Sequence, residues 1–255
     1  MYGYVIEKEL VQGKEDVMVT KVIEKIASLL TGSRSAEDYY NNGVDFVAKG
    51  RYDRAIANFD KAIQINPDFI NAYYNRGHAN HDIGNYDHAI ADYTKAIELK
   101  PDFYEAYGGR GNTYAIKGDY EHGISDYTKA IEIKPDDGTA YKNRGVTHYF
   151  KGDYKHAIAD FDKEIELNPD QAEAYNNRGF NYNAIGDHNH AIADYTKAIE
   201  LAPNYALAYI NRGLTYKSLG KATDAIMNFE HVLEISRDPK IRQQTEHELK
   251  DLKGK

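Results

Sequence analysis

Five asparagines recur at intervals of 34 residues, or of twice 34, and their side chains offer the clearest chemistry in the sequence. They are Asn41, Asn75, Asn143, Asn177 and Asn211. A primary amide both donates and accepts hydrogen bonds, so it can pair with a peptide backbone whatever side chains that peptide carries. A row of amides therefore favours sequence-tolerant binding of an extended segment. The alternative is that these amides bond only to neighbouring helices or to solvent.

Arginine and aspartate recur with the same period. The arginines are Arg76, Arg110, Arg144, Arg178 and Arg212, and the aspartates are Asp92, Asp126, Asp160 and Asp194. Where the first period lacks the arginine it also lacks the aspartate, because Asn42 and Asn58 occupy those two places. This joint change predicts Arg to Asp pairing between helices, within one period or across adjacent periods. Anion binding by the arginines is the functional alternative.

The histidines give no strong metal signal. Four of them recur once per period and lie too far apart to share an ion, so we expect them to be solvated or to cap helices: His88, His122, His156 and His190. His78, His81 and Asp82 are closer in sequence, but zinc would need a third strong ligand and outer support. The sequence therefore predicts no metal site.

Enzymatic activity is not expected either. The acidic side chains recur with the period and do not converge on a pocket, and no nucleophile motif or phosphate-cradling loop interrupts it. We therefore predict no catalytic residues and no cofactor.

Composition limits the partners and the compartment. The chain has 255 residues, and the absence of cysteine excludes disulfides, thiolate metal sites and a cysteine nucleophile. A net charge of −8 and a pI near 5.7 oppose binding to a phosphate backbone, so nucleic acid is not an expected partner. Charged residues are spread through residues 1–35, which leaves no apolar stretch resembling a signal peptide or a membrane span. We expect a soluble, cytoplasmic protein.

The period itself defines six gapless repeats of 34 residues: 36–69, 70–103, 104–137, 138–171, 172–205 and 206–239. Numbered from the first residue of each repeat, the fourth place is always Tyr, the eighth and fifteenth are always Gly, and the twenty-fourth is always aromatic. The second half of each repeat carries small and apolar residues at i, i+4, i+7 and i+8, which is one face of a helix. Each repeat therefore predicts two antiparallel helices that approach closely at the eighth-place Gly, with the fifteenth-place Gly ending the first helix in a left-handed conformation.

This pattern resembles the tetratricopeptide repeat over about four fifths of the chain. The resemblance implies an all-α fold, a right-handed superhelical solenoid of helix-turn-helix repeats. In that family the first helix of each repeat lines a concave groove and the second forms the outer wall. The implied function is that of a scaffold or adaptor that binds extended peptide segments of partner proteins in the groove.

The family's groove-lining places select the contact residues expected in this chain. The sixth place holds the five asparagines, and the other expected contacts are Tyr74, Lys142, Tyr149, Phe180, Ile210 and Leu214, with Phe150 and Leu207 beside them. Some members grip a terminal carboxylate with Lys and Asn from three consecutive repeats. Lys142 and Asn177 match single places of that clamp, but Val146, Leu207 and Asn211 do not match the rest. We therefore do not expect the clamp here.

The two ends of the chain depart from the repeat. Residues 240–255 contain Ile241, Thr245, Leu249 and Leu252 on one side of an otherwise polar segment, which predicts a solvating cap helix over 240–252. Residues 1–35 contain an amphipathic stretch that predicts a helix over about 17–30. This helix either caps the first repeat or docks in the groove of another copy. Docking would make the chain a self-assembling homo-oligomer, which is the alternative function.

Overall fold

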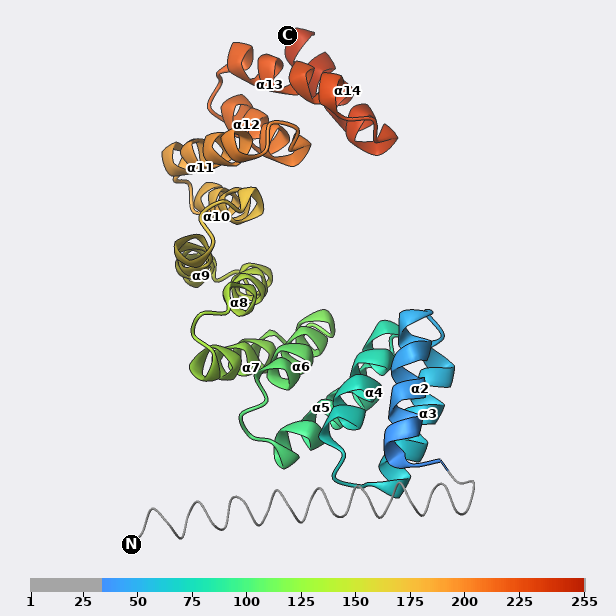
Figure 1. Cartoon of the computed structure of the whole chain (residues 1–255). Helices are drawn as coiled ribbons and strands as arrows, with labels where there is room; N and C mark the ends of the chain where they lie inside the picture. Colours follow the sequence, from blue (N-terminus) through green and yellow to red (C-terminus); the bar gives the residue numbers. More distant parts are fainter. Residues whose placement is uncertain (1–33, 255) are drawn as a thin grey trace, which may run out of the picture. The chain divides into compact units, whose positions relative to one another are not determined.

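The computed structural model describes residues 34–254. The helix expected over 17–30 therefore lies outside the described residues. The chain divides after Gly109 into two compact parts, which we call the N-terminal part (described from residue 34) and the C-terminal part (to residue 254), and each is described by itself. All described elements are helices joined by short loops (Figure 1), which confirms the all-α fold class.

Two helices form each repeat, as the period predicts. The N-terminal part holds α2 (Ala36–Ala48), α3 (Tyr52–Ile65), α4 (Ile70–Asp82), α5 (Tyr86–Leu99) and the first residues of α6 (Tyr104–Ile116). The C-terminal part holds the rest of α6, then α7 (Tyr120–Ile133), α8 (Gly138–Lys151), α9 (Tyr154–Leu167), α10 (Ala172–Ala184), α11 (His188–Leu201), α12 (Ala206–Ser218), α13 (Ala222–Ile235) and α14 (Pro239–Lys253). Among the described helices, none is both long and apolar enough to cross a bilayer.

The aromatic ring at the twenty-fourth place is the centre of every hairpin. Each of these six rings is at most 1% exposed: Phe59, Tyr93, Tyr127, Phe161, Tyr195 and Phe229. The eighth-place Gly lies against this ring, so that a Cβ atom at Gly213 would come within 2.8 Å of Phe229 and one at Gly77 within 3.1 Å of Tyr93. The close approach predicted at these glycines is confirmed: the ring is one partner, and at Gly111 and Gly179 a backbone carbonyl oxygen of the second helix lies at a similar distance.

The fifteenth-place Gly ends each first helix in the left-handed region, with φ between 66° and 84° in all six repeats. Asp119, Asp153 and Asp187, which follow this glycine, accept a hydrogen bond from a first-turn N–H of the next helix. Asn85 occupies the same place before α5, but its side chain makes no capping bond. The three aspartates are also held by a histidine imidazole three residues later, and no such contact orients the Asn85 amide.

The predicted Arg to Asp pairs are present both within and between repeats. Arg178 donates from Nε to Asp194 over 2.8 Å within its repeat, and from Nη1 to Asp162 of the preceding repeat over 2.7 Å. Arg76 makes the matching contacts in the N-terminal part. In repeat 1, Asn42 and Asn58 instead bond to carbonyls of their own helices. The Arg76 and Arg178 pairs thus join one first helix to two second helices.

Helix α14 covers the last hairpin, where the sequence predicts a helix over 240–252. Thr245 and Leu249 on its inner side are buried. Leu249 packs in one apolar cluster with Ala225 and Phe229, and Leu252 lies beside it. Because its other side carries exposed Gln, Glu and Lys, the helix presents a polar surface to water.

Candidate peptide-binding surface

The surface of interest is the side of the C-terminal part formed by α8, α10 and α12, which we call the first-helix face. Helix α10 contacts both α8 and α12. In Figure 1 these three helices lie along one side of this part, and α9 and α11 lie along the other. Residues at the same place of successive repeats therefore follow one another along this face.

The asparagines divide into two groups. The Asn75 Nδ2 atom donates to the Tyr40 hydroxyl over 2.8 Å, and the Asn211 Nδ2 atom donates to Asn176 Oδ1 over 2.9 Å. These two amides therefore join successive first helices. Among the described residues, the side-chain amides of Asn41, Asn143 and Asn177 have no partner.

The two open amides of the C-terminal part stand on adjacent helices. Asn143 lies on α8 and Asn177 on α10, at the same place of consecutive repeats, and both are half-buried. A half-buried amide without a partner has part of its hydrogen-bonding capacity unused. In the C-terminal part, this pair is therefore the section of the predicted row whose amides are open.

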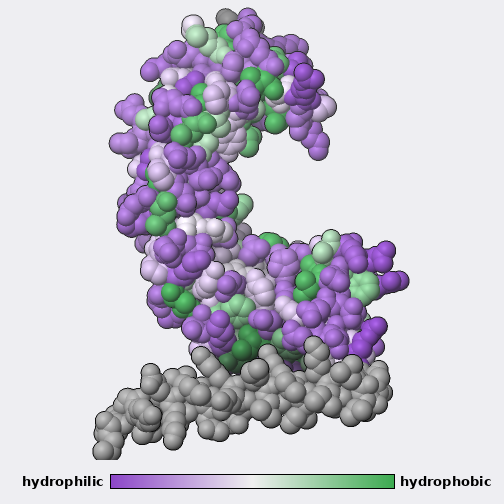
Figure 2. Space-filling view, viewed as in Figure 1, coloured by the Kyte–Doolittle hydropathy of each residue, from purple (hydrophilic) through white to green (hydrophobic). Residues whose placement is uncertain are grey.

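Exposed aromatic residues accompany the open amides. The Tyr149 ring on α8 meets the Phe180 ring on α10 edge to face, with centroids 5.3 Å apart, and Phe150 lies 5.2 Å from Tyr149. Phe150 is 62% exposed and Phe180 40%. Further along, α12 carries exposed Leu214. Figure 2 shows hydrophobic residues scattered among hydrophilic ones over the visible surface.

Two of the expected contact residues take part in packing. Ile210 is only 9% exposed and belongs to the core. Tyr74 lies between Tyr93 and Phe103, with centroid distances of 5.8 and 5.0 Å, and its burial raises the pKa of its hydroxyl. Ile210 therefore offers little surface to a ligand, whereas Tyr74 is half-buried and keeps part of its ring accessible.

Lys142 belongs to a charged group that the sequence reasoning did not identify. Its Nζ atom lies 3.2 Å from a Glu173 carboxylate oxygen. Beneath this pair, Glu164 is only 5% exposed, and its Oε2 atom has no hydrogen-bond partner. Burial is the main reason that the pKa of Glu164 is raised to about 7. The charge of Lys142 lowers this pKa, and the charge of Glu173 raises it.

The signal for Glu164 was present in the sequence. It stands at the twenty-seventh place, where the other repeats carry Ala62, Ala96, Ala130, Ala198 and Val232. A carboxylate at a place that otherwise holds small apolar side chains marks an exception to the template. Comparing repeats place by place for such exceptions would have found it.

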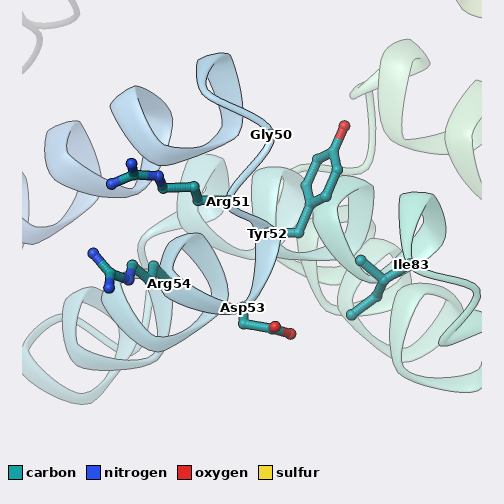
Figure 3. A pocket seen from close by; sticks show the side chains of 6 residues that line it. All are labelled: Gly50, Arg51, Tyr52, Asp53, Arg54 and Ile83. Carbon is teal, nitrogen blue, oxygen red and sulfur yellow. The ribbon is translucent and has the colours of Figure 1, made fainter.

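Other groups of side chains fit a site less well. Figure 3 shows a surface hollow of about 510 Å³ in the N-terminal part, lined by residues at the α2–α3 turn and by Ile83. The Arg51 and Arg54 side chains point away from Tyr52 and Ile83, so no set of polar groups converges there. His78 and Asp82 lie 3.4 Å apart, whereas His81 packs against Tyr86. A catalytic or metal site would require convergent groups.

Comparisons with known proteins agree with this architecture. Models of the TPR repeat and the tetratricopeptide repeat match residues 43–84, 70–103, 104–137, 138–171 and 170–238. No curated protein matches the chain in sequence.

Several solved structures are similar. A crystal structure of MamA is 29% identical with a TM-score of 0.59, and the match covers 62% of this chain and 92% of MamA. The structure of YrrB, described as a TPR protein with an unusual peptide-binding site, is 25% identical with a TM-score of 0.61, covering 74% of this chain and 97% of YrrB. A thermophilic TPR protein from Thermus thermophilus shares the fold at 22% identity and a TM-score of 0.53, with 71% and 98% covered. The chain therefore belongs to the tetratricopeptide repeat family, and its repeats form a protein-interaction scaffold.

Proposed function

We propose that this chain is an adaptor that binds an extended peptide segment of a partner protein on its first-helix face. The observation that carries the proposal is the pair of open, half-buried amides, Asn143 and Asn177, at the same place on adjacent helices. At the same place of other repeats, Asn75 and Asn211 donate hydrogen bonds to a neighbouring first helix. This place can therefore be used for hydrogen bonding across helices.

The spacing of the open amides suits an extended chain. Packed helices lie about 8–10 Å apart, and an extended peptide advances about 3.3 Å per residue. The amides of Asn143 and Asn177 would therefore meet backbone groups about three residues apart. Because each amide can donate to a carbonyl and accept from an N–H, these bonds would not depend on the peptide's side chains.

Affinity for particular segments would come from the aromatic residues. Phe180 and Phe150 are exposed and held by contact with Tyr149, so an apolar side chain of the peptide could bury them at little entropic cost. Lys142 is already paired with Glu173 and lies near the buried Glu164. We therefore propose an internal segment with an apolar anchor as the ligand, and not a terminal carboxylate.

On this proposal the chain acts by recruiting proteins and performs no catalysis. Its likeness to YrrB, which is described as having a peptide-binding site, supports the class of ligand. Self-assembly through residues 1–35 stays a prediction, because the segment that would mediate it lies outside the described residues.

The test uses a random peptide library selected on the intact chain, followed by fluorescence anisotropy with an enriched peptide. Substituting both open amides, Asn143→Ala and Asn177→Ala, should weaken binding about tenfold or more, because each hydrogen bond contributes about 0.5–1.5 kcal/mol. Asn189→Ala removes an exposed amide from α11, on the opposite layer, and should leave the affinity unchanged.

Two outcomes would contradict the proposal. One is a selected peptide that binds the double variant as tightly as the original chain, which would place the site elsewhere. The other is a selection that enriches no peptide at all. Phe180→Ala reports separately on the aromatic anchor, and its loss of affinity should be largest for peptides that carry a large apolar residue.

A further inference from the structure

We propose that the turn between α8 and α9 is a binding site for a divalent transition-metal ion of the zinc class, held by His148, Asp153 and His156. Among the described residues, these three side chains form a group whose potential ligand atoms all lie within 4.8 Å of one another. The site is separate from the peptide-binding surface and does not depend on the proposed function.

The helical turn brings the three side chains together. His148 lies in the last turn of α8, and Gly152 ends that helix with φ of 84°. Asp153 is the N-cap of α9, and its side chain accepts the backbone N–H of His156 in the first turn. Residues only eight positions apart thus converge because the chain reverses direction at the left-handed glycine.

The distances are close to those that a tetrahedral ion requires. His156 Nδ1 lies 2.7 Å from Asp153 Oδ2, and His148 Nδ1 lies 3.6 Å from the same oxygen. Zinc binds nitrogen and oxygen at about 2.0–2.2 Å, so its tetrahedral ligand atoms lie about 3.4 Å apart. The two histidine rings are stacked and their nitrogens lie within 4.8 Å of each other, so rotation of the exposed His156 ring, with loss of the proton shared by His156 and Asp153, would complete the arrangement.

The His148 ring provides a second and independent observation. The residue is only 9% exposed, and its Nδ1 atom is buried without a hydrogen-bond partner. Buried imidazole nitrogens normally have a bonding partner, and the residues around His148 supply none to its Nδ1 atom. Its Nε2 atom faces Asp160 Oδ2 at 4.0 Å, and Asp160 is fixed by Arg144. A carboxylate behind the outer nitrogen is the arrangement that orients a metal-binding histidine.

The donor set selects the class of ion. Two imidazole nitrogens and one carboxylate oxygen suit Zn²⁺ and its first-row neighbours, whereas Ca²⁺ and Mg²⁺ prefer oxygen ligands alone. The His156 side chain is 71% exposed, so a fourth coordination position would face solvent. A water molecule or a donor from a bound protein could occupy it.

Two neighbouring repeats provide an internal comparison. The same Asp and His pair occurs as Asp119 with His122 and as Asp187 with His190. In those repeats a tyrosine replaces His148: Tyr114 stacks on His122 and Tyr182 on His190, with centroids 5.1 Å apart in both, against 5.2 Å for His148 on His156. The three hairpins therefore share their geometry, and only the α8–α9 turn has a third ligand.

The test is isothermal titration of Zn²⁺ into the chelator-treated full chain. We expect one tight equivalent, and Co²⁺ in its place should show the visible absorption of a tetrahedral site. His148→Tyr recreates the stacking of the neighbouring repeats and should weaken zinc binding at least tenfold with helix content unchanged. His156→Ala alters an exposed side chain and should weaken it similarly, which keeps the test decisive if His148→Tyr folds poorly.

A gain of binding is the sharper experiment. Tyr114→His adds the third ligand beside Asp119 and His122, and the variant should bind a second equivalent of zinc. Zinc affinity that is unchanged in folded His148→Tyr, no tight equivalent in the original chain, or no second equivalent in Tyr114→His would each overturn the proposal.

Discussion

The two parts of the molecule use the same repeat but fill its fifth and thirty-fourth places differently. In the N-terminal part these places hold aromatic pairs, Tyr40 with Phe69 and Tyr74 with Phe103, whose ring centroids lie 4.9 and 5.0 Å apart. In repeat 4 of the C-terminal part the same places hold Lys142, which is paired with Glu173, and exposed Gln171. Repeats 1 and 2 thus close the contact between successive first helices with rings, whereas repeat 4 has charged and polar groups there.

The residues beneath these places differ in the same sense. Ala96 at the twenty-seventh place of repeat 2 is fully buried and apolar, whereas Glu164 in repeat 4 is a buried carboxylate. The twenty-fourth-place ring is equally buried in both, as Tyr93 and Phe161 show. The fold therefore depends on the constant ring and small residues, while the fifth and thirty-fourth places vary between repeats and Glu164 is the exception at the twenty-seventh.

The largest effect that this comparison predicts is for the aromatic pair. Phe103→Ala should lower the free energy of unfolding by about 3–5 kcal/mol, because a buried ring is lost and the contact with Tyr74 opens. Gln171→Ala changes the same place in repeat 4, and its exposure predicts a change within about 0.5 kcal/mol. Urea denaturation followed by circular dichroism measures both. Similar losses in the two variants would remove the distinction between the parts.

Repeat 1 lacks the Arg to Asp ion pair that other repeats carry. Removing such a pair should have the second largest effect on the free energy of unfolding. Arg178→Asn should cost about 2–4 kcal/mol, because it leaves Asp194 buried without its charged partner. Adding Asp194→Asn reproduces the Asn42 and Asn58 arrangement of repeat 1 and should recover part of that loss. The same urea denaturation assay measures the free energy of unfolding of the single and double variants. A double variant less stable than Arg178→Asn would show that the charge of Asp194 is stabilised by other groups.

The buried carboxylate predicts the smallest effect and a pH dependence. The pKa of Glu164 is about 7 in the folded chain against 4.5 as its ordinary value, so the folded state binds the proton more tightly. Its contribution to stability is therefore complete below pH 4.5 and is lost as the pH rises through 7. Relative to Glu164→Gln, the original chain should lose about 1–3 kcal/mol over this range.

Thermal unfolding of both proteins between pH 4 and 8 measures that difference. Glu166→Gln on the same helix provides the control, because Glu166 is exposed and its pairing with Lys163 is a surface contact. A stability difference for Glu164→Gln that stays constant across this pH range would mean that Glu164 is solvated in the folded chain.

Much of the fold could be predicted because its determinants are periodic. The twenty-fourth-place rings, the left-handed glycines and the pairing of Arg178 with Asp194 each follow from a residue type at a fixed spacing. The candidate surface was predicted less completely. The place of each asparagine could be read from the sequence, but whether its amide is open depends on the fifth-place residue of the preceding repeat. For Asn211 that residue is Asn176, which accepts its hydrogen bond, whereas for Asn177 it is Lys142 and the amide stays open.

The sequence by itself determined the repeat, its two helices and the positions of the asparagines in the row, because these depend on spacing within one repeating unit. Only the tertiary structure decided that Ile210 is buried, that the Glu164 Oε2 atom lacks a hydrogen-bond partner, and that His148 converges with Asp153 across a turn. These outcomes depend on which side chains meet between helices. Contacts of that kind are set by packing against the neighbouring helix, which a residue's place in its own repeat does not specify.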